Sequence, residues 1–178
     1  SLQPRAGTAY LARSASHDES PIHPHRPRQA DARAARRRAH DRGLLGLHRK
    51  ERAGERNGSE CTPRGRHRIC EKIGHSLPEG AVLVSREPTG EICTPETYRA
   101  CPGRDWILTR ILWLDGVEPG RNHGGEVDSR SRYIYIHGAP DDVAMGVPGS
   151  HGCVRMRNAD VCALFDLVDE GTLVDIVE

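Results

Sequence analysis

The large apolar side chains of this chain are distributed unevenly, and that distribution limits which part of it can fold. Residues 1–54 contain no valine, one isoleucine (Ile22) and one aromatic residue (Tyr10), whereas nearly all the β-branched and aromatic side chains lie in residues 55–178. A segment this poor in large apolar side chains cannot bury enough surface to offset the entropy that it loses on ordering. We therefore expect residues 1–54, rich in Arg, Ala and Pro, to be a disordered or atypical tail, and residues 55–178 to form one compact domain.

The net charge of +1 conceals two segments of opposite sign. Residues 1–54 carry 12 basic and 5 acidic side chains, and residues 55–178 carry 14 basic and 20 acidic ones. The basic run at 36–38 would suit contact with phosphates, but it lacks neighbouring aromatic residues on which bases would stack, and no nucleic-acid motif frames it. We therefore expect a solvated tail and no nucleic-acid partner.

Nothing in the sequence predicts a membrane span or a secretory leader. No run of about 18 apolar residues occurs, and the N-terminal residues lack the apolar stretch of a signal peptide. Two alternatives stay open on this ground: a cytosolic protein, or an exported one whose signal is missing from this chain. The cysteines do not decide between them, because an even count of six suits disulfides, whereas one reactive thiol would leave an odd remainder.

The segment 55–178 has the pattern of a mainly β domain. A nearly continuous β-branched and aromatic run at 106–114 predicts a strand that is buried on both faces. The alternation at 133–137 predicts another strand, with its isoleucines on one face and its tyrosines and His137 on the other. Shorter apolar stretches predict further strands at 68–73, 81–85 and 172–177.

One helix is expected near the C-terminal end of the chain. Asn158 is placed as its N-cap, and an apolar stripe at helical spacing follows: Val161, Leu164, Phe165 and Val168. Residues 86–105 and 115–132 are expected to be long polar loops. The second is rich in glycine and directly precedes a predicted strand, so two interpretations stay open: a lid over a site, or a mobile surface loop.

Residue types that suit thiol chemistry lie at the end of the 133–137 strand and beyond it. A thiol becomes a competent nucleophile when a neighbouring imidazole holds it as thiolate, and Cys153 and His137 supply these two groups. Gly152 allows a sharp turn beside the cysteine and leaves backbone N–H groups for a developing oxyanion. Arg155 adds a planar cation that suits a substrate carboxylate.

Other interpretations of these residue types stay open at this stage. A lone cysteine is most often a small buried apolar residue, which is what we expect of Cys70 and Cys162. His137, His151 and Cys153 also offer three ligands of types that bind zinc, although no fourth ligand shows a recognisable spacing. The residue types alone favour thiol catalysis over a metal site.

Two runs of sequence resemble a known signature. Residues 135–138 read Tyr-Ile-His-Gly and residues 148–156 read Pro-Gly-Ser-His-Gly-Cys-Val-Arg-Met, which together resemble the signature of the L,D-transpeptidase catalytic domain family (YkuD type). The Gly-Ser and Thr-Pro-Arg-Gly runs at 58–59 and 62–65 are similar to that family's upstream segment. The resemblance covers about residues 53–178 and continues through Asn158, Asp160, Gly171, Thr172 and Val174.

The resemblance implies a mixed β-sheet sandwich and an enzyme that acts on peptidoglycan stem peptides, with no cofactor and no metal. In this family a cysteine attacks the carbonyl of the diamino acid before the terminal D-alanine, D-alanine leaves, and a thioester acyl-enzyme forms. An amine acceptor, on a second stem or on a lipoprotein, then resolves the thioester into a cross-link. Such enzymes serve cell-wall synthesis and cell shape in the periplasm or cell envelope, and carbapenems acylate them.

The resemblance also implies roles for individual residues. Cys153 would be the nucleophile and His137 the base, with the backbone carbonyl of Gly138 orienting the imidazole. The N–H groups of Gly152 and Cys153 would form the oxyanion hole. The residues that would line the substrate site are Ser150, His151, Arg155 and Tyr135; His151 suits a structural hydrogen bond equally well.

Two alternatives to transpeptidation remain within this expectation. With water as the acceptor, the same residues would give an L,D-carboxypeptidase; an altered N-terminal part would leave an inactive peptidoglycan-binding protein. Upstream of residue 53 the family has β-patterned strands, whereas this chain has a tract rich in Arg, Ala, Pro and His. We therefore interpret residues 1–54 either as a tail that leaves a sheet edge exposed or as an out-of-frame segment, and residues 55–178 as the catalytic domain.

Overall fold

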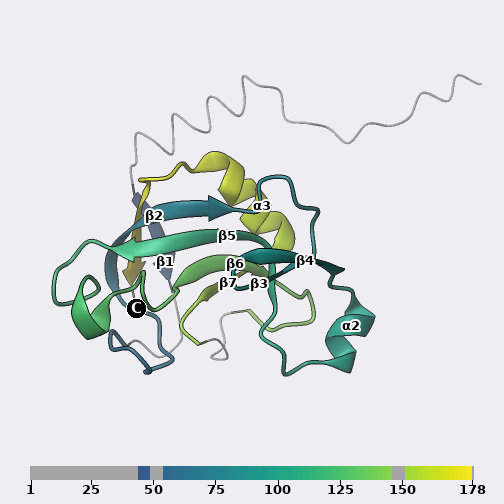
Figure 1. Ribbon diagram of the computed structural model, residues 1–178. Helices are drawn as coiled ribbons and strands as arrows, with labels where there is room; N and C mark the ends of the chain where they lie inside the picture. Colours follow the sequence, from purple (N-terminus) through teal and green to yellow (C-terminus); the bar gives the residue numbers. More distant parts are fainter. Residues whose placement is uncertain (1–43, 49–53, 146–150, 178) are drawn as a thin grey trace, which may run out of the picture.

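The computed structural model describes residues 44–48, 54–145 and 151–177. Eight strands form one mixed sheet, in which six follow the order β1-β8-β2-β5-β3-β4 while β6 pairs with β5 and β7 pairs with β6 (Figure 1). The mainly β fold expected from the sequence is confirmed. The strands are β1 (Leu44–His48), β2 (Gly65–Ile73), β3 (Ala81–Val84), β4 (Glu87–Ile92), β5 (Ile107–Gly116), β6 (Tyr135–Ala139), β7 (Val154–Arg157) and β8 (Leu173–Val177).

The long strand β5 is the centre of the sheet. It pairs antiparallel with β2, with β3 and with β6, and Leu108, Ile111, Leu112 and Trp113 have strand partners on both sides. Leu112 and Leu114 are fully buried in one apolar cluster, and Ile111 is fully buried in another. Because successive side chains of a strand point to opposite faces, this strand separates two apolar layers, as its sequence predicted.

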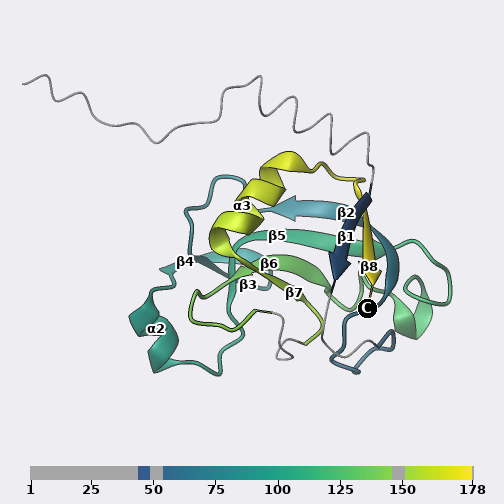
Figure 2. The same cartoon turned by 180° about the vertical axis from the view of Figure 1, so that it is seen from behind.

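Helix α3 (Asn158–Leu167) packs against one face of β5, β6 and β7 (Figure 2). Val161 and Phe165, fully buried, lie in one cluster with side chains from β2, β5, β6 and β8. The apolar stripe predicted for this helix therefore supplies the layer that covers the sheet on that side. The opposite face of the sheet carries a second cluster around Leu83, Ile111 and Tyr135.

The structure differs from the sequence-based prediction between residues 86 and 105. This segment is not a loop throughout, because it contains β4 and a second α-helix, α2 (Pro95–Ala100). The expectation of a single helix was thus incomplete. A capping box fixes the start of α2: the Thr97 N–H donates to Thr94 Oγ1 at 3.3 Å, and the Thr94 N–H donates to Thr97 Oγ1 at 2.8 Å. Neither the polar β4 nor the short α2 has a buried apolar stripe, so the sequence pattern did not predict them.

Asn158 does not cap α3 as predicted. Arg157 occupies the N-cap position, without a side-chain hydrogen bond to the helix. The Asn158 side chain instead turns into the protein, where its Oδ1 accepts a hydrogen bond from Thr109 Oγ1 at 2.6 Å. The tertiary contact has taken precedence over the local cap.

Strand β1 lies within residues 1–54, for which we expected a disordered or atypical tail. It pairs in parallel with β8, from Leu44 beside Leu173 to His48 beside Val177. The prediction of disorder is therefore wrong for this strand, which lies beside β8 at one end of the strand order. Its formation depends on a partner from the far end of the chain, which composition does not reveal. The rest of the expected tail, residues 1–43 and 49–53, lies outside the described residues.

A short 3-10 helix, η1 (Gly125–Val127), lies in the segment between β5 and β6. None of the helices in the described ranges has the length and apolar character needed to cross a bilayer.

Candidate active site

Two neighbouring parallel strands bring the predicted base and nucleophile together. β6 and β7 are in register with Ile136 beside Val154 and His137 beside Arg155, and Cys153 directly precedes β7. Ile136 and Val154 pack into the cluster under α3. Because side chains alternate along a strand, His137, Cys153 and Arg155 belong to the opposite face of the sheet.

The thiol of Cys153 is held at the start of this pair of strands. Its S–H donates to the backbone carbonyl of Tyr133 at 3.3 Å, and its sulfur accepts from the backbone N–H of Tyr135 at 3.4 Å. The side chain is half-buried and packs against the Tyr135 cluster. The sulfur is thus fixed by the backbone of β6 and by the residues just before it.

The imidazole of His137 is almost fully buried, with 1% of the residue exposed. Nδ1 lies 2.8 Å from the carbonyl oxygen of its neighbour Gly138. Because a carbonyl can only accept, Nδ1 carries the proton, which leaves Nε2 as the basic nitrogen in the neutral ring. The hydrogen bond expected between the Gly138 carbonyl and the imidazole is present.

Gly138 has no room for a side chain. A Cβ there would lie 2.4 Å from Asn158 Oδ1 and 2.8 Å from the Leu108 carbonyl oxygen. The close packing of β6 against β5 and the start of α3 thus requires glycine at the position whose carbonyl accepts from His137 Nδ1.

Gly152 forms the turn before Cys153. Its φ of +108° lies in the region that favours glycine, and a Cβ there would lie 2.9 Å from the Cys61 carbonyl oxygen. Its own carbonyl accepts a hydrogen bond from the buried Thr62 Oγ1 at 2.8 Å. The 61–62 segment therefore contacts Gly152 twice, once by close packing and once by a hydrogen bond.

Thr62 and Arg132 contribute to this arrangement, and our sequence analysis gave neither a role. The Arg132 guanidinium donates to the carbonyls of Cys61, at 2.7 Å, and Glu55, and burial lowers the pKa of this arginine. Arg132 thus ties the 54–61 segment to the residues just before β6. Both side chains act on backbone carbonyls far away in sequence, so the sequence carries no local signal for them.

A cavity of about 230 Å³ adjoins the predicted site residues. His151 and Arg155, two of the residues predicted to bind substrate, line it, and Trp106 forms part of its wall. The guanidinium of Arg104 lies 4.4 Å from the centre of the Trp106 ring. The remaining lining residues come from the α2–β5 connection and from the end of β6: Tyr98, Pro102, Gly103, Asp105, Ala139, Pro140 and Val143.

The other two predicted substrate residues are Ser150 and Tyr135. Ser150 lies outside the described residues. Tyr135 is buried beside Cys153, and its hydroxyl accepts a hydrogen bond from Arg86 Nη1 at 3.1 Å. Burial raises the pKa of the Tyr135 phenol, while the Arg86 hydrogen bond opposes that shift.

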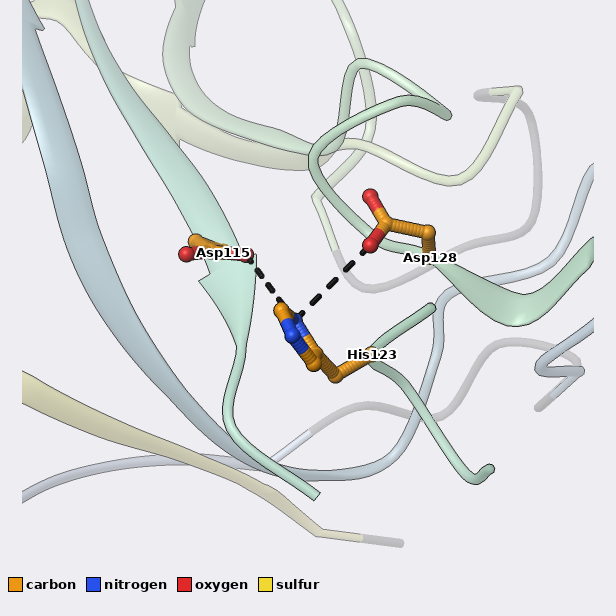
Figure 3. A group of neighbouring side chains, drawn as sticks. All are labelled: Asp115, His123 and Asp128. Atoms are coloured by element: carbon orange, nitrogen blue, oxygen red, sulfur yellow. Dashed lines mark ion pairs between the residues drawn. The ribbon is translucent and has the colours of Figure 1, made fainter. Parts of the chain in front are cut away.

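A separate cluster of possible metal ligands lies at the end of β5 and in the segment that follows it. Asp115, His123 and Asp128 place one ligand atom each within 4.8 Å of one another (Figure 3). Both carboxylates already have partners, because Asp115 accepts from Arg68 Nη2 at 2.6 Å and Asp128 accepts from backbone N–H groups. We interpret the cluster as an ion-pair network. It does not include His137, His151 or Cys153, the three residues considered as zinc ligands.

The same segment, expected to be a lid or a mobile loop, is anchored to β2. Asn122 is fully buried, and its Nδ2 donates to the carbonyls of Arg64 and Arg66 at 3.0 Å each. At Gly116 the backbone of Asn122 passes so close that a Cβ would clash with it. These contacts hold the first half of the loop in place.

Comparisons with known proteins agree with the sequence signature. The sequence model of the YkuD family, the L,D-transpeptidase catalytic domain, matches residues 38–176, beginning before residue 53, where we expected the resemblance to begin. Over 47 residues, 26% of this chain, the sequence is 43% identical to the probable L,D-transpeptidases YbiS of Escherichia coli (strain K12) and ErfK/SrfK of Salmonella typhimurium.

These matches differ in extent. The aligned part spans only 15% of the length of YbiS and of ErfK/SrfK. Among solved structures, an L,D-transpeptidase from Mycobacterium smegmatis is similar with a TM-score of 0.35 and 20% identity, over 70% of this chain and 46% of that one. The family match, in contrast, covers most of the chain. The chain therefore belongs to the L,D-transpeptidase catalytic domain family, whose members are acyltransferases.

Proposed function

We propose that this protein is a peptidoglycan L,D-transpeptidase that works through Cys153. The observation that carries the proposal is the pairing of β6 with β7, which puts His137 and Cys153 on one face of the sheet, next to a cavity lined by His151 and Arg155. A base, a thiol and an anion-binding group on one face are what acyl transfer by a cysteine requires.

In the first half of the reaction the Cys153 sulfur attacks the carbonyl carbon of the diamino acid that precedes the terminal D-alanine. His137 Nε2 takes the thiol proton, and the backbone N–H groups of Gly152 and Cys153 donate to the oxyanion that develops. When the tetrahedral intermediate collapses, the C–N bond breaks and the departing D-alanine amine takes the proton from His137. The product is a thioester between Cys153 and the stem peptide.

In the second half an amine of another stem, or of a lipoprotein, attacks the thioester carbonyl. His137 takes a proton from that amine and returns it to the sulfur as the thiol leaves, so the enzyme is regenerated. Water in place of the amine would give hydrolysis of the same thioester. The hydrogen bond from His137 Nδ1 to the Gly138 carbonyl supports this cycle. It keeps the ring proton on Nδ1, so Nε2 is the nitrogen that can accept a proton.

The cavity supports binding of the donor stem. Arg155 lies beside His137 in the strand register and lines the cavity with His151. An arginine there can hold a carboxylate of the stem with a pair of parallel hydrogen bonds. We propose that the donor occupies this cavity and that Ser150 and Tyr135 also belong to the substrate site. We further propose that the protein works in the cell envelope, where its substrate lies.

We also propose that the catalytic machinery resides in residues 55–178 and that much of the 1–54 segment is a tail or an out-of-frame segment, β1 excepted. Sequencing the encoding DNA tests the second alternative. An upstream frame without a β-patterned segment would rule it out.

The test of the proposed activity is acylation followed by product analysis. Incubation with stem tetrapeptides is expected to give cross-linked dimers, and a carbapenem is expected to add its mass to the protein once. Cys153→Ala should abolish both, whereas Cys162→Ala, which removes another half-buried thiol, should leave both intact. An adduct that persists in Cys153→Ala contradicts the nucleophile assignment, and trimmed monomers without dimers would indicate a carboxypeptidase.

A further inference from the structure

A group of stacked side chains beside the thiol is not used by the mechanism above. The Arg86 guanidinium lies 4.8 Å from the centre of the Trp113 ring and 5.0 Å from that of Tyr133, and these two rings lie 5.8 Å apart. A second guanidinium, that of Arg130, lies 5.7 Å from the Trp113 ring. We call Arg86, Trp113, Tyr133 and Arg130 the arginine–aromatic platform.

The platform lies directly beside the nucleophile. The Tyr133 carbonyl accepts from the Cys153 thiol, and Tyr135, which packs at 5.7 Å against Trp113, donates its N–H to the same sulfur. Along β6 the order is Tyr135, His137 and then Ala139, which lines the 230 Å³ cavity. The platform and the cavity therefore lie on opposite sides of His137.

The backbone adopts rare conformations to present this platform. Ser85 and Arg86 form the two-residue turn between β3 and β4, with φ of +50° and +73°, where asparagine and glycine are usual. Tyr133, 52% exposed, has a φ of +56°. Such conformations cost energy in residues other than glycine and concentrate at functional sites. Two segments far apart in sequence both adopt them where they meet.

The chemistry of the platform suits an anionic ligand with apolar surface. The rings of Trp113 and Tyr133 lie against the Arg86 guanidinium, and its Nη1 donates to the Tyr135 hydroxyl. Among the described residues, its other N–H groups have no hydrogen-bond acceptor, and the one nearby carboxylate with a resolved influence on its pKa is Glu71. A planar guanidinium fixed in this way can grip a carboxylate bidentately, while the exposed Tyr133 ring offers a face to aliphatic groups.

We propose that the arginine–aromatic platform binds the acceptor stem through one of its free carboxylates, with Arg86 as the specificity-determining residue. The inference rests on the proposed function. The donor remains covalently attached while the acceptor arrives, so the two need separate surfaces. The cavity, lined by His151 and Arg155, suits the donor, and the platform, which carries the two guanidinium groups, lies on the other side of His137.

The experiment separates donor from acceptor with two blocked probes. The donor is a stem tetrapeptide whose side-chain amine is acetylated, so it cannot act as an acceptor. The acceptor is a stem tripeptide that ends in the diamino acid, so it has no terminal D-alanine to lose. For Arg86→Gln we expect the KM for the acceptor to rise at least tenfold, while the rate of acyl-enzyme formation from the donor stays within about twofold of wild type.

A second acceptor tests the carboxylate directly. Amidation of the acceptor's carboxylates should raise the acceptor KM of the wild type about as much as Arg86→Gln does. In Arg86→Gln itself, amidation should raise this KM little further. Arg86→Lys, which keeps the charge but loses the planar fork, should fall between the two. Arg121→Gln, which removes an exposed arginine paired with Glu118, should behave as wild type.

The outcomes distinguish this inference from the proposed function. If the wild type forms no acyl-enzyme with the blocked donor, the proposed function fails. If the acyl-enzyme forms normally in Arg86→Gln and the acceptor KM is unchanged, only the platform inference is overturned. The unchanged donor rate also shows that the variant is folded.

Discussion

Gly152 shows how a single residue without a side chain can determine the position of the proposed nucleophile, Cys153. Its left-handed backbone and its contact with the Cys61 carbonyl belong to one tight turn that also receives the Thr62 hydroxyl. Cys153 follows immediately, so any displacement of this turn moves the sulfur relative to His137.

We expect Gly152→Ala to slow acylation of Cys153 about 100-fold, because a shift of about 1 Å in a reacting group has an effect of that size. The free energy of unfolding should fall by about 1–3 kcal/mol. Rates come from intact-mass measurement of the carbapenem adduct, and stability from urea unfolding.

Gly171→Ala is the matched control for this change. Gly171 also has a positive φ, of +89°, but no atom would lie within 4 Å of an added Cβ. It should lose stability through backbone strain while acylation stays normal. Equal acylation rates in the two variants would contradict the role given to the Gly152 turn.

The sequence indicates the residues that we propose to react, but not the contacts that hold them in place. The order of His137, Gly138, Gly152 and Cys153 along the chain is enough to indicate thiol chemistry, because these residues meet through two strands. The support from Thr62 operates through a backbone carbonyl ninety residues away, and a hydroxyl has no sequence pattern that identifies its acceptor.

At the scale of elements, α3 supplies two fully buried side chains, Val161 and Phe165, to the apolar cluster that it forms with the sheet. Phe165 is 1% exposed, and Lys72 lies over its ring, with Nζ 4.4 Å from the centroid. The same ammonium group donates to the carbonyls of Phe165 and Val168 at 2.6 Å each, at the end of the helix. This helix end is thus fixed to β2 by apolar and by polar contacts.

Phe165→Ala is expected to lower the free energy of unfolding by about 3–5 kcal/mol, because it removes a fully buried ring and leaves a cavity. Urea unfolding measures the change. Leu167→Ala, on the same helix but 37% exposed, should cost much less. Similar losses in the two variants would contradict the assignment of Phe165 to the core.

Elements with a strong apolar pattern were predictable, and those without one were not. The continuous apolar run of β5 and the apolar stripe of α3 are visible in the local sequence and predict which residues are buried. β4 is almost entirely exposed and α2 buries no residue, so neither has a periodic signal. β1 depends on β8 for its pairing, which is a property of the folded chain and not of the local sequence.

At the scale of the whole molecule, buried His67 links stability to pH. Its ring is fully buried, with Nε2 2.9 Å from Ser129 Oγ. Burial lowers the pKa of His67 below the usual 6.5, although the Gly65 carbonyl and nearby carboxylates oppose the shift. Below pH 6.5 the unfolded chain therefore binds a proton at this residue that the folded chain does not bind, and stability decreases as the pH falls.

We expect the free energy of unfolding to be lower at about pH 5.5 than at about pH 7.5, and the decrease to be smaller in His67→Gln. Urea unfolding at the two values measures it. The carboxylates contribute at lower pH, because the Arg64 hydrogen bond holds the pKa of Glu55 below its usual value of 4.5. An identical decrease in His67→Gln would assign the effect to another group.

The register between β6 and β7 makes assembly of the catalytic pair an all-or-none event. Ile136 lies beside Val154 under the helix, and the odd-numbered neighbours His137 and Cys153 consequently share the other face. A slip of β7 by one residue would send the thiol into the core and the apolar Val154 into the site, with no intermediate alignment available. Because side chains alternate between the two faces, the alignment that packs Val154 against the core is also the one that puts Cys153 beside the cavity face. A misaligned chain would lose its core packing together with the proposed nucleophile, so we expect no folded form in which the two strands are misaligned.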